Sequence, residues 1–363
     1  MRQRVPSAIS RWLIHAAFLS VAWWCGGLLP SSAAALTPND FYYSTYQGYL
    51  DLIGAPAAWE ISTGSPSVIV AVLDSGVNAA TPDLAGRVLP GISTSTGPVL
   101  DGITISHGTQ VASVVAMDIN NGIGGAGIGR FTILPITVTN TIGGNNSYWL
   151  ADGVRRAAAE GAKAIVLSLS TLTYGPVNQA AAEVADQALV FVAAGNTNSL
   201  RSEVALPNYE HLIFVSGTMG DDRAVWTGGG SSWGPAVDLS APAVNVLVAD
   251  PTVLPNGYGL NSGTSFAAPI AAGAAALAWS INPNLTPSQV KEILFSTATD
   301  LGEPGWDEVF GHGRVNLAGV AAAAAATVPE PAVMLSLAML TAIGVFRATV
   351  RTGNRSARLR KRR

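Results

Sequence analysis

Cysteine and histidine are scarce in this sequence. Its 363 residues include one cysteine, Cys25, which lies within the first 35 residues. The rest of the chain can therefore form no internal disulfide, even in an oxidising compartment. Beyond residue 35 there are three histidines, His107, His211 and His312. Chemistry that needs an imidazole as proton acceptor must use one of these three.

Charged residues are also few, at 12% of the chain, and they are unevenly distributed. Residues 36–327 carry 22 acidic and 9 basic side chains, a formal net charge of −13. The segment from residue 328 onward holds eight Lys and Arg residues and one acid, Glu330. An acidic main region argues against nucleic acid as a partner and against general adsorption to anionic lipid. It is compatible with an extracellular enzyme that binds cations.

The first 35 residues have the pattern of a secretory signal peptide. Arginines come first, an apolar stretch follows, and small residues end the segment. We expect signal peptidase to cleave after Ala35. The chain then divides into a signal peptide (1–35), a main domain (36–321), a linker (322–327) and a C-terminal tail (328–363).

Apolar runs rich in β-branched residues alternate with helical stretches in the main domain. Such runs suit strands that are buried on both faces, as in parallel sheets. The expected strands are residues 67–74, 131–138, 163–170, 189–195 and 212–217, and the expected helices are 107–117, 147–162 and 177–187. This alternation predicts an α/β fold, a doubly wound, mostly parallel sheet with helices on both faces. A later helix should begin with Thr286 as N-cap, Pro287 at its first position and Gln289 closing a capping box.

An alanine-rich run near the end of the main domain raises a question about one serine. In NSGTSFAAPIAAGAAALAWS, residues 261–280, Ser265 precedes almost pure alanine, which predicts a buried helix. Ser265 could cap that helix, since serine is a favoured N-cap. It could instead be a nucleophile at the helix N-terminus, where N–H groups and the helix dipole favour negative charge.

Three other residues favour a nucleophile. Asp74 ends an expected strand in VLDSG, His107 begins an expected helix in HGTQVAS, and Asn196 follows an expected strand in VAAGN. Singly, these residues suit a turn, a helix cap and a left-handed position. Chemistry in a doubly wound sheet lies beyond the carboxyl ends of its strands, so they should meet Ser265 there. A hydroxyl, an imidazole, a carboxylate and an oxyanion donor are the groups that acyl transfer needs.

The motifs around these residues resemble the subtilisin family, in particular its thermitase-like members. The matching motifs are VAVLDSGV, HGTQVAS, VLSLS, AAGN, SGTSFAAP, WGPAVDLSAP and GHGRVNL, and the resemblance extends from about Thr37 to Ala321. It implies a subtilisin-like fold and an exported, monomeric serine endopeptidase that acts on proteins and peptides.

The resemblance also implies a role for each residue of the set. Asp74 would orient His107, and His107 would act as general base and then as general acid. Ser265 would attack the peptide carbonyl. The Asn196 side chain and the Ser265 backbone N–H would form the oxyanion hole, with the triad in the order Asp, His, Ser.

Two segments would line the substrate cleft in such an enzyme. One consists of Ser168, Leu169 and Ser170, and the other of Ala193, Ala194 and Gly195. In the family the first segment is an edge strand that pairs with the substrate backbone by β-augmentation. Ser170 stands where glycine is usual, so its side chain would narrow the cleft.

Three further positions depart from the family pattern. Gln110 stands where a second histidine is common, Ser113 where glycine is common, and Ile270 where histidine is usual. None removes a triad member, so we still expect activity. In addition, LTPND directly follows the expected signal peptide and leaves no room for the usual folding propeptide. Folding should then be unassisted or use calcium or another chain as a template.

The thermitase-like pattern further implies structural Ca²⁺ as a cofactor. Asp40, Asp83 and Asn121 occupy the matching positions, although each alone would be an ordinary turn residue. The pattern brings their oxygens together with backbone carbonyls from residues 118–125. Calcium prefers 6–8 oxygen ligands, which these groups and water would supply.

The tail combines VPEP, an apolar stretch from Ala332 to Phe346 and a basic cluster. As a helix the apolar stretch would be about 22 Å long, short of the ~30 Å hydrocarbon core. One interpretation is a membrane anchor with its arginines in the cytoplasm. The other is a sorting signal, because the tail resembles the PEP-CTERM tails of some Gram-negative bacteria. That resemblance implies recognition at Pro329–Pro331 by an exosortase, removal of the helix and a location at the outer envelope or outside the cell.

Two other functions stay open. The chain could be an inactive subtilase-fold surface or binding module, although the intact set of four residues argues against this. The same machinery could also perform peptide ligation or ester hydrolysis.

Overall fold

The computed structural model describes residues 36–104, 106–139, 146–169, 174–201, 209–253 and 256–328. The chain divides into two units, Met1–Ala35 and Leu36–Arg363, and all described residues belong to the second. The expected signal peptide, Ser170 and the tail from Pro329 onward lie outside the described residues.

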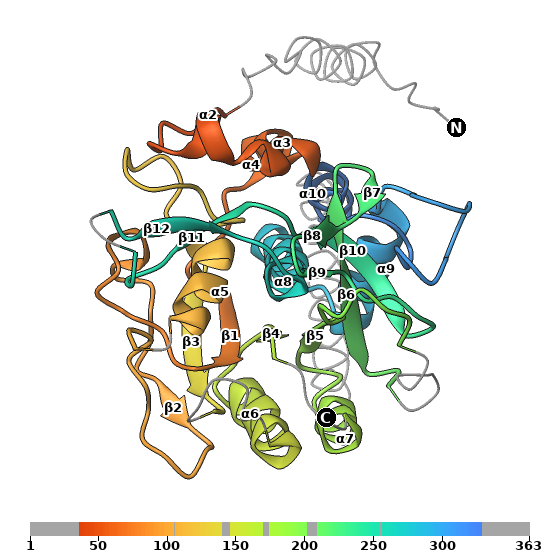
Figure 1. The fold of residues 1–363 in the computed structure, drawn as a ribbon. Coiled ribbons are helices and arrows are strands. Elements are labelled where there is room, and N and C mark those ends of the chain that lie inside the picture. The colour runs from red at the N-terminus through yellow and green to blue at the C-terminus, as the bar shows by residue number, and fades with distance from the viewer. Residues whose placement is uncertain are drawn as a thin grey trace, which may run out of the picture. The chain divides into compact units, whose positions relative to one another are not determined.

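A parallel sheet forms the centre of the domain (Figure 1). Its strands are β1 (Ile69–Asp74), β2 (Ile92–Ser93), β3 (Thr132–Thr137), β4 (Ala164–Leu167), β5 (Leu189–Ala193), β6 (Leu212–Met219) and β10 (Val237–Pro242). Within the described ranges their order is β10-β6-β5-β4-β1-β3-β2 with every neighbouring pair parallel, and β7 (Asp222–Arg223) adds to β6 antiparallel. Strand order reverses at β1, which lies between β3 and β4, and such a reversal is where doubly wound sheets hold their ligands.

Burial on both faces explains the composition of the strands. Every residue of β4 and β5 is buried, and so is every residue of β1 after Ile69. The expected strands are thus confirmed, but three of them end earlier than expected, β3 by one residue, β5 by two and β4 by three. β4 stops at Leu167 and β5 at Ala193, so the segments that follow them lie beyond the carboxyl edge of the sheet.

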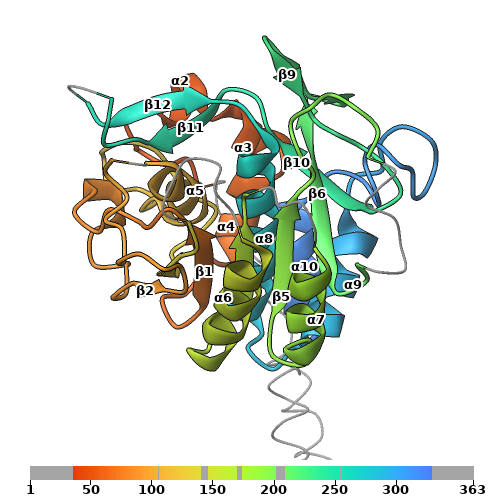
Figure 2. The same cartoon turned by 60° about the horizontal axis from the view of Figure 1, so that its bottom comes forward.

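Helices cover both faces of the sheet, as the alternating pattern predicts. One hydrophobic core packs the first face against α4 (Ala55–Ile61), α5 (His107–Ala116), α8 (Thr264–Ile281), α9 (Pro287–Thr297) and α10 (Leu317–Ala326). A second core packs the other face against α6 (Ser147–Ala159) and α7 (Gly175–Glu183), which lie on the near side of the sheet in Figure 2. The doubly wound α/β architecture is confirmed.

Short elements complete the domain. They are α2 (Tyr43–Tyr46), α3 (Gly48–Leu52), the 3₁₀ helix η1 (Pro82–Leu84), and two hairpins, β8 (Val225–Trp226) with β9 (Gly229–Gly230) and β11 (Val246–Ala249) with β12 (Tyr258–Asn261). The β11–β12 hairpin lies over α5 and leads directly into α8 (Figure 1).

The alanine-rich run forms α8, a central helix that contacts α5 and strands β4, β5, β6 and β10. Small side chains allow this close approach, since a Cβ added at Gly273 would lie 2.7 Å from Cβ of Ile128. Gly263 is the N-cap, so the interpretation of Ser265 as a helix cap is wrong. Among the described helices α8 alone has the length and hydropathy to cross a membrane, yet 89% of it is buried in the domain.

The next two helices differ in how well the sequence predicts their ends. α9 has the expected capping box, in which the Thr286 side chain accepts from Gln289 N–H and the Gln289 side chain accepts from Thr286 N–H. The expected linker at 322–327 is instead mostly helix, because α10 continues to Ala326. Alanine favours helix, and Ala324 is buried in the first core, so this segment belongs to the domain.

Candidate active site

Asp74 and His107 meet at the carboxyl end of β1. Asp74 is the last residue of that strand and fully buried, and His107 is the first residue of α5. The His107 Nδ1 atom lies 3.0 Å from Asp74 Oδ1 and 2.9 Å from Oδ2. Gly108 makes this approach feasible, because a Cβ there would clash with the backbone oxygen of Gly76. The carboxylate thus fixes the imidazole with Nε2 as its outer nitrogen.

Beside Asp74, the His107 imidazole holds its proton more tightly than a free imidazole does in water. Burial lowers the pKa of His107, but the charge of Asp74 and its hydrogen bond outweigh burial, so the pKa is raised above its ordinary 6.5. The His107 side chain remains 32% exposed, which leaves it accessible to a ligand. A buried carboxylate behind an accessible imidazole is the pairing a general base requires.

Ser265 is the second residue of α8, the helix whose start approaches the imidazole. The next residue, Phe266, places its ring centroid 6.3 Å from that of His107. The Ser265 hydroxyl donates to the backbone oxygen of Ser168 at 3.1 Å, and the Ser168 hydroxyl donates to the backbone oxygen of Ser265 at 2.7 Å. Although both residues are described, no hydrogen bond joins Ser265 to His107. Catalytic hydrogen bonds in ligand-free enzymes are often long and tighten only when substrate binds.

Asn196 follows β5 and faces the start of α8. Its Oδ1 accepts from the Thr264 N–H at 2.9 Å and from the Thr264 hydroxyl at 2.8 Å. The amide oxygen is thereby used, and Nδ2 is left as the outward donor. Thr264 was not identified from the sequence, although its place directly before Ser265 was a signal that could have found it.

The two expected cleft segments lie at the ends of β4 and β5. Ser168 is buried, Leu169 is half-buried, and Ala193 and Ala194 are buried. Gly195 has φ of +109°, which favours glycine, and its N–H donates to the Thr264 hydroxyl at 3.1 Å.

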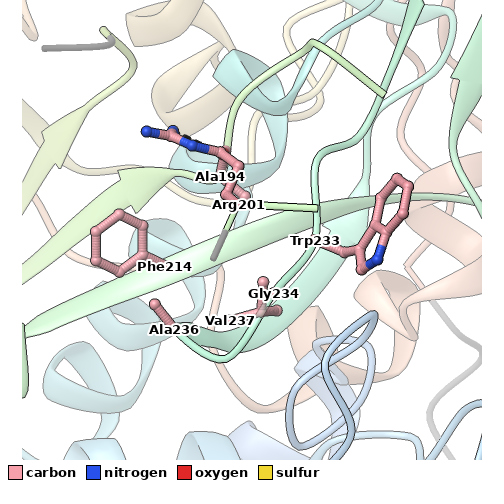
Figure 3. Close-up of a pocket in the computed structure, with 7 residues that line it drawn as sticks. All are labelled: Ala194, Arg201, Phe214, Trp233, Gly234, Ala236 and Val237. Atoms are coloured by element: carbon pink, nitrogen blue, oxygen red, sulfur yellow. Dashed lines mark hydrogen bonds between the residues drawn. The ribbon is translucent and has the colours of Figure 1, made fainter. Parts of the chain in front are cut away.

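A small hollow lies under Ala194 (Figure 3). Phe214 and Arg201 lie on one side of it and Trp233 on the other. Arg201 Nη1 donates to the backbone oxygen of Ala194 at 3.1 Å. The hollow measures about 10 Å³, room for one water and no side chain.

Asp40, Asp83 and Asn121 come together in a separate place. The Asn121 N–H donates to Asp40 Oδ1 at 2.9 Å, and its side-chain amide donates to Asp83 Oδ1 at 2.7 Å. Asp83 also accepts from Gly125 N–H and the Tyr258 hydroxyl. Both carboxylates are buried, and neither forms a described salt bridge.

In the described residues no cationic side chain pairs with the carboxylates of Asp40 and Asp83. Burial and the nearby charge of Asp40 raise the pKa of Asp83 to about 6, against the lowering effect of its hydrogen bonds. The two carboxylates are oxygen donors that suit calcium, whereas the Asn121 amide turns its nitrogen to Asp83 and its oxygen to the Ile123 N–H. No three His, Cys, Asp or Glu side chains gather anywhere in the described ranges, so a metal here would need amide and backbone oxygens too. Asp118 instead pairs with Arg87 at 2.6 Å and Arg130 at 3.1 Å.

Comparison with known proteins gives several similar serine proteases. The chain is 33% identical over 285 residues to the thermophilic serine proteinase of Bacillus sp. (strain AK1), which covers 78% of this chain and 69% of that protein. It is 33% identical over 288 residues to thermitase of Thermoactinomyces vulgaris, which covers 77% of this chain and 97% of that protein. A lanthipeptide protease structure superposes with a TM-score of 0.67 at 26% identity, covering 80% of this chain and 99% of that one.

A family model described as the subtilase family, Peptidase_S8, matches residues 65–313. That range includes β1, α5, β4, β5 and the start of α8, the elements that carry the Asp, His, Asn and Ser residues described above. This chain belongs to the subtilase family of serine peptidases.

Proposed function

We propose that this chain is an exported serine endopeptidase that cleaves peptide bonds through an acyl-enzyme. The observation that carries the proposal is the Asp74–His107 pair, with Nδ1 within 3.0 Å of both carboxylate oxygens. Ser265, the second residue of α8, is the nucleophile that the family resemblance pairs with it. Each group then has a distinct role in acyl transfer.

In the first half of the reaction the Ser265 hydroxyl turns from Ser168 to His107. His107 Nε2 takes the hydroxyl proton as Oγ attacks the carbonyl carbon of the peptide. Asp74 stabilises the resulting imidazolium and holds its tautomer. His107 then gives the proton to the leaving amine, the C–N bond breaks, and an ester to Ser265 remains. Water attacks this ester in the second half with His107 again as base.

The oxyanion of both tetrahedral intermediates would lie between two donors. One is Asn196 Nδ2, which Thr264 orients by holding Oδ1 at 2.8 and 2.9 Å. The other is the Ser265 N–H, since the first N–H groups of a helix lack intrahelical acceptors. The positive end of the α8 dipole adds to their effect. Donors fixed before the reaction stabilise developing charge without reorganising.

Hydrolysis of a peptide library by the purified full chain tests the proposal. We expect wild type to cleave internal peptide bonds and Ser265→Ala to lose cleavage by several orders of magnitude with unchanged circular dichroism. Binding of peptides without cleavage would instead support an inactive binding module. Turnover of esters or ligation of peptides without hydrolysis would redirect the proposal to those reactions.

We further propose that Asp40, Asp83 and Asn121 hold a structural calcium ion. Support comes from two buried carboxylates beside each other with neutral hydrogen-bond donors around them. A bound cation would neutralise these charges. Asp40 belongs to the N-terminal segment and accepts from the Asn120 and Asn121 N–H groups, so the ion would tie that segment to the 118–125 loop.

Export and sorting form the last part of the proposal. The sequence of residues 1–35 supports cleavage by signal peptidase, and the tail from Val328 supports processing at Pro329–Pro331 by an exosortase. Mass spectrometry of the protein from its host tests both. We expect an N-terminus at Leu36 and a C-terminus near Glu330, whereas a C-terminus beyond Phe346 would indicate a retained anchor.

A further inference from the structure

A buried polar network lies one helical turn from His107. Its centre is Gln110 in α5, which is 7% exposed. Gln110 Nε2 donates to Asp250 Oδ2 at 2.7 Å and to the Ser106 hydroxyl at 3.1 Å. Its Oε1 accepts from Asn261 Nδ2 at 3.0 Å. The amide therefore uses both ends, and turning it over would oppose donor to donor and acceptor to acceptor.

The network contains a charge. Asp250 is 9% exposed and follows β11 directly. Burial raises the pKa of Asp250, but hydrogen bonds from Thr252, Ser106 and Gln110 outweigh it and lower the pKa below the ordinary value. The carboxylate is thus ionised at neutral pH. Charge-assisted hydrogen bonds are stronger than neutral ones, so the bond to Gln110 resists displacement by water.

The network joins α5, which carries the base, to the β11–β12 hairpin, which precedes the helix of the nucleophile. Ser106 and Gln110 flank His107 in α5, while Asp250 and Asn261 belong to the β11–β12 hairpin, which leads through Gly263 into α8. The contact spans 140 residues of sequence. The hairpin runs into α8, so these bonds tie the segment that precedes Ser265 to the helix that carries His107.

Ser113, one turn further along α5, makes a second link between this helix and β11. The Ser113 hydroxyl donates to the Gln110 backbone oxygen at 2.7 Å and accepts from the Ala249 N–H at 2.9 Å. The side chains of Gln110 and Ser113 thus both place hydrogen bonds between α5 and the β11–β12 hairpin.

We propose that Gln110 is a positioning residue that holds His107 in register with Ser265 through Asp250 and Asn261. The inference rests on the proposed peptidase mechanism, in which His107 must accept the Ser265 proton. The α5 helix cannot shift against the hairpin without breaking the bonds to Asp250 and Asn261. A misplacement of about 1 Å at a reacting group can lower a rate by about 10²-fold.

Gln110→Met tests the role, because methionine keeps the length of glutamine and removes its hydrogen bonds. We expect kcat, and the rate at which a fluorophosphonate labels Ser265, to fall together by about 10- to 100-fold, with KM changed little. Gln110→His should restore part of the rate, since a neutral imidazole offers one donor for Asp250 and one acceptor for Asn261 but none for Ser106. Asn261→Leu removes the bond to Gln110 Oε1 and the bond that Asn261 Oδ1 accepts from the Ser262 N–H, but it leaves the Gln110–Asp250 bond intact. It should therefore lower the labelling rate less than Gln110→Met.

Gln289→Met is the control for the same substitution away from His107. The Gln289 side chain accepts from the Thr286 N–H at 2.8 Å at the start of α9, at an exposed position. The Gln289→Met substitution should lower Tm without changing the rate at which the fluorophosphonate labels Ser265. A Gln110→Met variant with reduced Tm and an unchanged labelling rate would overturn the positioning role. If Gln110→Met does not fold, the test passes to Asn261→Leu. A labelling rate of Asn261→Leu equal to that of wild type would then overturn the positioning role. A wild-type chain that the probe leaves unlabelled would contradict the peptidase mechanism itself.

Discussion

Asp74 and Asp83 are both fully buried carboxylates, but their surroundings differ. Asp74 faces His107 Nδ1 at 2.9 Å, a partner that can take and give a proton. Asp83 faces the neutral donors of Asn121, Gly125 and Tyr258, and the charge of Asp40 lies nearby. A buried charge needs a compensating partner. Asp74 therefore suits acid–base chemistry, whereas Asp83 suits the binding of a cation.

The largest expected effect comes from exchanging the first of these carboxylates. Asp74→Asn should lower kcat about 10⁴-fold, because an amide favours the wrong imidazole tautomer. The matched variant is Asp83→Asn, which removes a carboxylate of equal burial and should lower Tm with a far smaller effect on kcat. Steady-state kinetics and thermal melts of both variants make the measurement. Equal losses of kcat would erase the distinction between the two aspartates.

A second prediction concerns Asn196, which would stabilise the negative charge that develops on the substrate oxygen in the transition state. Asn196→Ala removes the donor that Thr264 holds in place, and kcat should fall about 10²- to 10³-fold with KM little changed. The same kinetic assay checks this. A rise in KM at constant kcat would assign Asn196 to ground-state binding instead.

The pH dependence of the reaction tests the His107 side of the comparison. His107 must be neutral to act as base, and its pKa is raised above 6.5, so kcat/KM should fall as pH drops through a value above 6.5. In Asp74→Asn the acid limb of any residual activity should move to lower pH, because the stabilising charge is gone. An acid limb that stays in place would show that Asp74 does not set this pKa.

The raised pKa of His107 also makes the free energy of unfolding depend on pH. A histidine whose folded pKa exceeds its unfolded value stabilises the fold below the unfolded pKa, and this contribution is lost as pH rises through the folded pKa. The Asp74–His107 pair should therefore contribute more at pH 5 than at pH 9. Denaturant titrations of wild type and His107→Gln at both pH values measure the difference.

The smallest effect concerns the second carboxylate. Removing calcium with a chelator should lower Tm by several degrees, because an ion at 100 times its Kd adds about 2.7 kcal/mol to the folded state. Asp83→Asn should reduce that dependence, and Glu292→Gln, an exposed acid on α9, should leave it intact. A wild-type Tm that is equal in chelator and in calcium would contradict the calcium site.

Local signals explain what the sequence predicts well. A strand buried on both faces must be apolar throughout, and so β1 was expected within two residues of its observed bounds, Ile69–Asp74. The cap of α9 uses residues within one turn, and Thr286, Pro287 and Gln289 behave as expected. The Asp74–His107 contact follows from strand ends meeting at one edge of the sheet, aided by the family resemblance.

Contacts between distant residues explain what the sequence does not predict. The Gln110–Asp250 bond and the two bonds between Ser168 and Ser265 depend on how the hairpin and β4 pack against the helices. The length of α10 likewise depends on burial of Ala324, which an alanine run alone does not reveal. The roles of Ser170 and of the tail stay predictions, because both lie outside the described residues.

Covalent labelling tests the central claim most directly. The protein as purified from its host is treated with a fluorophosphonate and mapped by peptide mass spectrometry. We predict one adduct, on Ser265, whose rate of formation falls as pH drops through a value above 6.5 and falls sharply in Asp74→Asn. An adduct on another residue, or no adduct on a folded chain at pH 8, would contradict the assignment of Asp74, His107 and Ser265 as one catalytic unit.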